Sequence, residues 1–180
     1  MKKASVILIA FTMFCSCMQQ ALQSTYDKQT TTIESFVTAC MKADTTATLT
    51  RTGGAYRVTM KDVLDPTRDS LGWTGKVTME YALYLLSGTS VSSSNLVSTN
   101  VKAIASAAGW ELSDTSIFAP VTLSMTGDLL EGLRSGLYGV QPLDEAYILF
   151  NGKYAYGNDA QGTIPANSGL VYHIWIDSIE

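Results

Sequence analysis

The sequence predicts one α+β domain in which antiparallel strands surround a short apolar helix. Segments 77–85 and 170–176 alternate apolar and polar residues, which is the pattern of strands that bury one face. Between them, Leu129, Leu130 and Leu133 recur at the spacing of an apolar helix face. With 180 residues, 46% of them hydrophobic, the chain is long enough to bury one real core.

The first residues have the pattern of an export signal followed by a lipid-attachment site. An uncharged apolar stretch, 6–14, follows two lysines and is too short to span a membrane as a stable helix. Cys17 follows a small serine and resembles the lipid-bearing cysteine of bacterial lipoproteins, whereas Cys15 follows a bulky phenylalanine. The resemblance implies a signal peptide over 1–16 and acylation of Cys17, with a plain secretory signal or a buried helix as alternatives.

A lipoprotein of this kind would be anchored to a membrane of the bacterial cell envelope. No acidic run that would indicate surface export follows Cys17, so we expect a periplasm-facing anchor at the outer membrane. Removal of the two N-terminal lysines would change the net charge from −4 to −6. Such an acidic chain lacks the basic patches that bind nucleic acid, so we expect no nucleic-acid partner.

A tether and a helix are expected over 17–54, before a main domain at 55–180. Residues 18–29 are polar without periodicity, which indicates a flexible tether. Thr31 and Glu34 then fit a capping box at a helix start. The apolar stripe of this helix consists of Ile33, Phe36, Val37, Cys40 and Met41. We expect the stripe to dock on the domain itself, with homodimerisation through this helix as the alternative.

The first half of the domain follows from alternation and turn chemistry. Residues 44–54 are rich in threonine and glycine and indicate a connector, after which 56–60 alternates as a strand. A loop is expected over 61–75, followed by the long strand 77–85. The serine-rich segment 87–94 has the composition of a mobile hairpin tip.

The second half begins with an insert and ends in the C-terminal strand. Ser98 and Asn100 offer caps for a second helix that Gly109 would end, which gives a helical insert over 99–119. Four elements remain: a strand at 121–125, the short helix at 129–136 stopped by Gly136, a strand at 147–149 and the last strand at 170–176. His173, the single histidine, alternates with the core positions of the last strand and is therefore expected to be exposed.

Three segments of the last third, taken in order, resemble FKBP-type peptidyl-prolyl isomerases. They are the apolar helix 129–137, the Tyr-Ala-Tyr-Gly loop 154–157, and the Ile-Pro turn at 164–165 that leads into the last strand. The resemblance extends from Val58 to the C-terminus and is to a bacterial lipoprotein subgroup with a divergent pocket. It implies an FKBP-like antiparallel sheet wrapped around a short helix, with an N-terminal helix and a helical insert as additions.

The resemblance also implies a substrate pocket. Leu130 would offer its backbone N–H to the ligand, and Tyr156 would hydrogen-bond a substrate carbonyl. The implied pocket residues are Tyr81, Val97, Val121, Leu129, Leu130, Leu133, Tyr156, Ile164 and Tyr172.

This chain departs from the family pattern inside that pocket. Leu133 stands where the family has a tryptophan, and Val121 replaces an aromatic residue. The family's Phe-Asp pair becomes Val-Ser in either of two registers, 91–92 or 97–98, and we prefer the second because Ser98 leads into a helix. That aspartate is linked in the family to activity and to macrolide binding.

The implied function is a cell-envelope peptidyl-prolyl isomerase that binds X-Pro segments of proline-containing polypeptides and assists their folding. Such catalysis lowers a rotation barrier of about 20 kcal/mol by binding the twisted amide better than the planar one. It needs neither a cofactor nor a metal. One histidine, and Cys40 as the one cysteine after the lipid-attachment site, leave no metal site of usual composition. The alternative is a non-catalytic, FKBP-like peptide-binding or chaperone-like lipoprotein.

Overall fold

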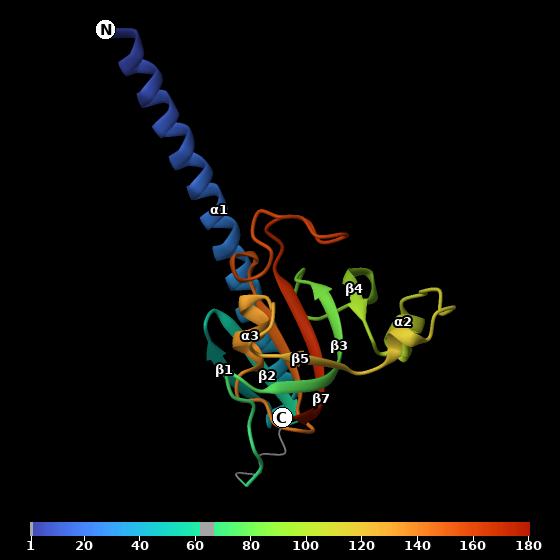
Figure 1. Cartoon of the computed structure of the whole chain (residues 1–180). Coiled ribbons are helices and arrows are strands. Elements are labelled where there is room, and N and C mark those ends of the chain that lie inside the picture. Colours follow the sequence, from blue (N-terminus) through green and yellow to red (C-terminus); the bar gives the residue numbers. More distant parts are fainter. Residues whose placement is uncertain (1, 62–66) are drawn as a thin grey trace.

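The computed structural model describes residues 2–61 and 67–180, with side chains at all of these positions except 2–18 and 61 (Figure 1). The helices are α1 (Lys2–Ala43), α2 (Lys102–Ala107) and α3 (Glu131–Leu137), with 3-10 turns at Ser93–Asn95, Ser116–Phe118 and Gly152–Tyr154. The strands are β1 (Thr48–Thr52), β2 (Ala55–Lys61), β3 (Lys76–Leu85), β4 (Leu96–Thr99), β5 (Val121–Ser124), β6 (Glu145–Phe150) and β7 (Leu170–Ile179).

The described strands form one antiparallel sheet. Its order is β1-β2-β6-β7-β3, and both β4 and β5 pair with β3 on the side away from β7. The two central strands, β3 and β7, pair along almost their whole lengths, with a register shift between Thr78 and Met79. This long pairing confirms the strands expected from the alternation at 77–85 and 170–176.

The sheet buries side chains on both faces, and a different helix covers each face. On one, which we call the α3 face, the core includes Met79, Ile148 and Ile174 around Leu137 of α3. On the other, the α1 face, Leu149 and Val171 pack with apolar residues of α1. Because neighbouring strand residues point to opposite faces, Ile148 of β6 packs in the core of the α3 face and Leu149 in the core of the α1 face.

Helix α3 lies unusually close to the sheet because it carries glycine at two buried positions. Gly132 faces the ring of Phe150 and Gly136 faces Ile148, so that a Cβ at either position would overlap those side chains. The guanidinium of Arg57 on β2 donates to the carbonyls of Gly136 (2.9 Å) and Tyr138 (2.7 Å) at the end of α3. The helix ends one residue beyond the predicted stop at Gly136.

Helix α1 is continuous through the segment predicted to be a tether. The prediction of a flexible tether over 18–29, with a helix start at Thr31, was wrong. The segment is polar but helical, and its threonine hydroxyls donate to carbonyls four residues earlier instead of capping a helix end, as Thr25 does to Ala21 (3.1 Å) and Thr31 to Asp27 (3.1 Å). Tyr26 is also buried, at 8% exposure.

The apolar stripe of α1 rests on the sheet of its own chain. Ile33, Phe36 and Val37 are buried against β2, β6 and β7, as expected for docking on the parent domain. Cys40 is half-buried at the edge of this cluster, where burial raises the pKa of its thiol. Within the described part of the chain, no helix is both long enough and apolar enough to cross a membrane. Cys17 and the signal at 1–16 lie outside the residues whose side chains are described.

The sequence predicted a connector over 44–54 and did not predict strand β1 within it. Only Leu49 of the strand is a large apolar residue, and β1 is the edge of the sheet, so its threonines are half-exposed and show no buried face. Its register with β2 is set by the tight turn at Gly53 and Gly54, both with positive φ. Of the predicted loop 61–75, residues 62–66 lie outside the described part.

The predicted caps of α2 have a different role. Ser98 and Thr99 belong to β4, and α2 begins after Val101 without a side-chain cap. Asn100 is 2% exposed, and its side chain replaces strand hydrogen bonds where β4 ends. Its Oδ1 accepts from the Tyr81 N–H (2.6 Å), and its Nδ2 donates to the Ala119 carbonyl (2.9 Å). Asn100 therefore holds together the two ends of the insert 99–119. Helix α2 lies beside β4 at the edge of the sheet, where Ala105 is buried and Ile104 packs against the core of the α1 face (Figure 1). Gly109 follows α2 with φ 74°, as its predicted end requires.

His173 is not exposed, contrary to the expectation from alternation. Its side chain is 13% exposed, lies against the rings of Tyr147 (4.1 Å) and Trp175 (3.9 Å), and its Nε2 is 2.9 Å from Glu145 Oε1. The expectation failed because the α1 face is a second core rather than a solvent surface. Burial lowers the pKa of the imidazole, against the opposing effect of Glu145, so the ring is neutral at pH 7.

Candidate functional site

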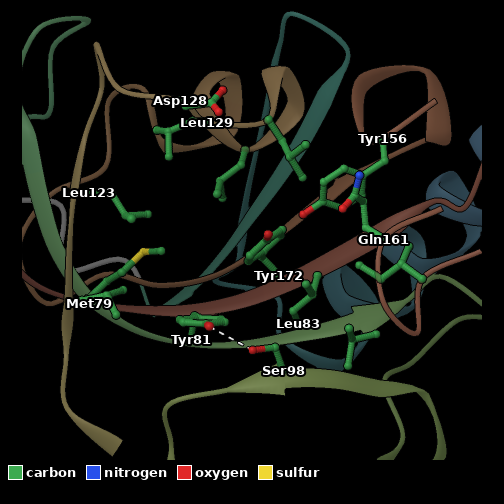
Figure 2. A pocket seen from close by; sticks show the side chains of 15 residues that line it. Met79, Tyr81, Leu83, Ser98, Leu123, Asp128, Leu129, Tyr156, Gln161 and Tyr172 are labelled. Atoms are coloured by element: carbon green, nitrogen blue, oxygen red, sulfur yellow. Dashed lines mark hydrogen bonds between the residues drawn. The ribbon is translucent and has the colours of Figure 1, made fainter. Parts of the chain in front are cut away.

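A cavity of about 420 Å³ opens on the α3 face of the sheet (Figure 2). All nine residues that the sequence singled out for a pocket line it. Tyr81 comes from β3, Val97 from β4, Val121 from β5, Leu129, Leu130 and Leu133 from the start of α3, Tyr156 and Ile164 from the loop before β7, and Tyr172 from β7. Residues from six parts of the chain thus meet at one place.

The cavity has six further lining residues. Met79 and Leu83 share the face of Tyr81 by the two-residue period of β3, and Leu123 follows Val121 in the same way. That alternation was the signal that would have found them. Ser98, Asp128 and Gln161 bring the polar groups, and of these the sequence pointed only to Ser98.

The floor of the cavity is aromatic and rigid. Tyr172 is 8% exposed, and its ring lies 6.0 Å from the ring of Phe150 beneath it and 6.1 Å from that of Tyr81. Burial raises the pKa of the Tyr172 phenol far above its usual 10, and the neighbouring Tyr156 and Tyr81 add to the shift. The Tyr172 hydroxyl is therefore protonated at any physiological pH.

Tyr81 is paired with a neutral partner. Its hydroxyl lies 3.0 Å from the hydroxyl of Ser98, and this contact is drawn as the dashed line in Figure 2. Ser98 is the residue that the preferred register places where the resembled family has aspartate. The contact supports the register 97–98 over 91–92, because Val97 and Ser98 line the cavity whereas the other pair does not.

Two residues that line the cavity carry a hydrogen-bond donor without a partner in the described part of the chain. The backbone N–H of Leu130 precedes the first turn of α3, where helix N–H groups have no carbonyl to bond. The hydroxyl of Tyr156 reaches over the cavity toward Tyr172 and makes no bond to the other residues drawn in Figure 2. Apolar walls with two such donors suit an extended peptide segment that carries apolar rings and free carbonyls.

The loop that carries Tyr156 and Ile164 runs from Asn151 to Asn167, and we call it the tyrosine loop. Its turns close on backbone bonds: the Gly157 N–H donates to the Gly152 carbonyl (2.9 Å), and the Asn167 N–H donates to the Gly157 carbonyl. Asn167 has φ 60°, in the left-handed region. The conformation of Tyr156 is therefore tied to the two ends of the loop.

The cavity carries little charge. Asp128 is exposed at its edge, and no lysine or arginine is among the lining residues. In the part of the chain that the structure describes, no three His, Cys, Asp or Glu side chains gather as metal ligands do.

Comparison with solved structures shows which fold this is. A structure of the three FKBP domains of wheat FKBP73 superposes with a TM-score of 0.56 and 16% sequence identity. The fold is FKBP-like. The match covers 74% of this chain and 51% of the wheat chain, so this protein spans about half the length of that neighbour. No family model and no curated protein matches the sequence.

An FKBP-like fold at this level of identity establishes architecture, and activity has to be argued from the site. The cavity of this FKBP-like domain lies between β3, β5, α3 and the tyrosine loop.

Proposed function

We propose that this protein binds X-Pro segments of polypeptides in the FKBP-like cavity and catalyses rotation about the X-Pro bond. The observation that carries the proposal is the pairing of apolar walls with two unengaged donors, the Leu130 N–H and the Tyr156 hydroxyl. A proline ring fits against Tyr172 and Leu133 on the cavity floor. The two donors then hold the peptide carbonyls on either side of the ring.

The chemistry requires no nucleophile and no proton transfer. The planar amide is stabilised by resonance that places partial charge on oxygen and nitrogen, and the twisted amide loses that charge separation. An apolar cavity therefore favours the twisted form over the planar one, which is the differential binding that catalysis requires. Donors that fix the flanking carbonyls hold one side of the bond while the other side rotates.

Tyr156→Phe should lower kcat/KM for prolyl isomerisation roughly five- to tenfold, the effect of one hydrogen bond made to the substrate. The assay is protease-free and uses a proline-containing peptide and a protein whose refolding is limited by a proline step. Tyr154→Phe is the matched control, because Tyr154 lies in the same loop but does not line the cavity. An unchanged rate in Tyr156→Phe would exclude its hydroxyl from catalysis.

The second candidate function is peptide binding without catalysis. It is favoured by the neutral Tyr81–Ser98 pair, which offers no carboxylate to polarise the tyrosine hydroxyl. A folded sample that binds the proline peptide but does not accelerate its isomerisation would establish this function instead of the first.

We further propose that the chain is a lipoprotein of the bacterial cell envelope, held at the periplasmic side of the outer membrane through Cys17 after removal of 1–16. The sequence pattern around Cys17 supports this. Helix α1 runs without a break from Cys17 to the folded domain (Figure 1). Tyr26 lies nine positions after Cys17 in the helix, which corresponds to a rise of about 14 Å. The cavity would then stay close to the membrane.

Cys17→Ser should release the protein from the membrane fraction of cells that process lipoproteins, because one thioether carries the acyl anchor. Fractionation followed by immunoblotting measures this, with Cys15→Ser as the matched control that should stay membrane-bound. Equal retention of both variants in the membrane would contradict lipidation at Cys17.

A further inference from the structure

Helix α1 holds the tyrosine loop at both of its ends through a single side chain. The Oε1 of Gln29 accepts from the backbone N–H of Gly152 (2.8 Å), near the start of the loop. The Nε2 of the same glutamine donates to the backbone carbonyl of Asn167 (2.7 Å), at its end. One amide group thus bridges two backbone positions that are fifteen residues apart in the chain.

Two neighbours of Gln29 on α1 extend this contact. The buried Tyr26 hydroxyl donates to Asn167 Oδ1 (2.7 Å), and Asn151 Nδ2 donates to Thr30 Oγ1 (3.3 Å). Asn167 is the non-glycine residue of the loop with φ in the left-handed region, a conformation that the contacts with α1 help it to keep. Gly152 has no room for a side chain, because a Cβ there would overlap the Asn167 backbone.

The bridge connects directly to the turn that carries Tyr156. Gly152 accepts from the Gly157 N–H, and Gly157 accepts from the Asn167 N–H. The two loop positions that Gln29 holds are therefore the two that bond Gly157, the residue after Tyr156. The rest of α1 contacts the sheet through Ile33 and Phe36, so the loop contact is separate from the docking contact.

We propose that Gln29, assisted by Tyr26, is a positioning residue of the site: it fixes the tyrosine loop so that Tyr156 and Ile164 face the cavity. The consequence for catalysis rests on the proposed isomerase function, whereas the consequence for the loop does not. The helix that leads toward the N-terminus is then part of the site, and its attachment sets the shape of the cavity.

The test compares Gln29→Ala with Gln23→Ala in the full chain, purified in detergent. Gln23 lies on the same helix, but its amide bonds only Asp27 of α1, so the control removes the same group without touching the loop. Hydrogen exchange is followed by mass spectrometry in peptides from 152–167 and from β7. We expect Gln29→Ala to speed exchange in the loop roughly tenfold or more, with β7 unchanged, because two hydrogen bonds that keep the loop closed are lost.

The catalytic readout is a double-mutant cycle. Gln29→Ala should lower kcat/KM for prolyl isomerisation roughly tenfold in the wild-type background and have little effect in the Tyr156→Phe background, since both changes remove the same interaction. Gln29→Glu keeps the acceptor for Gly152 and loses the donor to Asn167, so it should fall between wild type and alanine. Where Gln29→Ala does not fold, Tyr26→Phe removes one loop bond and should give the same pattern at a smaller size.

Equal loop exchange in Gln29→Ala and Gln23→Ala would overturn the proposal. The proposal would also be overturned if Gln29→Ala increased the hydrogen-exchange rate in β7 as much as in the loop, because Gln29 would then stabilise the whole fold. If the protein shows no isomerase activity in any form, the proposed function fails while the exchange result still decides whether Gln29 positions the loop.

Discussion

Phe36→Ala is expected to lower the free energy of unfolding by about 3–5 kcal/mol, as large-to-small changes of buried phenylalanine do. Phe36 is 2% exposed and meets the ring of Tyr147 edge-to-face at 5.3 Å. It also lies in the cluster that joins α1 to Leu149 and Val171 on the sheet. Alanine would leave a cavity between a helix and a sheet that other contacts still hold in place, so little of the space can collapse.

Urea unfolding measures this effect, and Thr38→Ala provides the control on the same helix. Thr38 is exposed, and its hydroxyl bonds only the Glu34 carbonyl within the helix, so its replacement should change stability by less than about 0.5 kcal/mol. If Phe36→Ala lowered the free energy of unfolding as little as Thr38→Ala, the apolar stripe of α1 would not be packed on the sheet of its own chain in solution. In that case light scattering should show a dimer formed through α1, which was the alternative to docking on the chain's own domain.

The sequence predicted β2, β3, β5, β6 and β7 because apolar residues alternate along them, and it missed β1 and β4. Where this signal is absent, the prediction failed. β1 is an edge strand whose threonines give no alternation of burial, and His173 sits on a face that is buried only because α1 covers it. The helical course of 18–29 was hidden because this polar segment has no apolar periodicity, and because Thr31, expected to cap a helix start, instead bonds back to Asp27 inside the helix.

The cavity could be anticipated because its residues occur in motifs with fixed order and spacing along the chain. The contacts that support the motifs could not. Gln29 bonds Gly152 across 123 residues of sequence, and Asn100 bonds the strand that carries Tyr81, nineteen residues away. Neither polar residue stands in a pattern of its own, so these links become visible only once the chain has folded.

Gly132→Ala should destabilise the protein by about 1–3 kcal/mol even though alanine is the better helix former. In an open helix this exchange would stabilise by up to about 1 kcal/mol. Here the added Cβ would overlap the inner atoms of the Phe150 ring, which is fully buried and stacked on Tyr172. Overpacking therefore outweighs helix propensity, because neither the ring nor the strand beneath it has space to retreat.

Gly88→Ala is the matched control, since a Cβ there would meet nothing within 4 Å and its backbone has no positive φ. Urea unfolding should show that variant within about 0.5 kcal/mol of wild type. The comparison also bears on the site. If Gly132→Ala folds with reduced stability, displacement of the Phe150 ring by the added Cβ should shift the Tyr172 ring stacked on it and weaken binding of a proline peptide. Equal stability of the two variants would mean that α3 can move away from the sheet. Leu133 on the cavity floor would then move with the helix, and the cavity could not hold a substrate ring in one place.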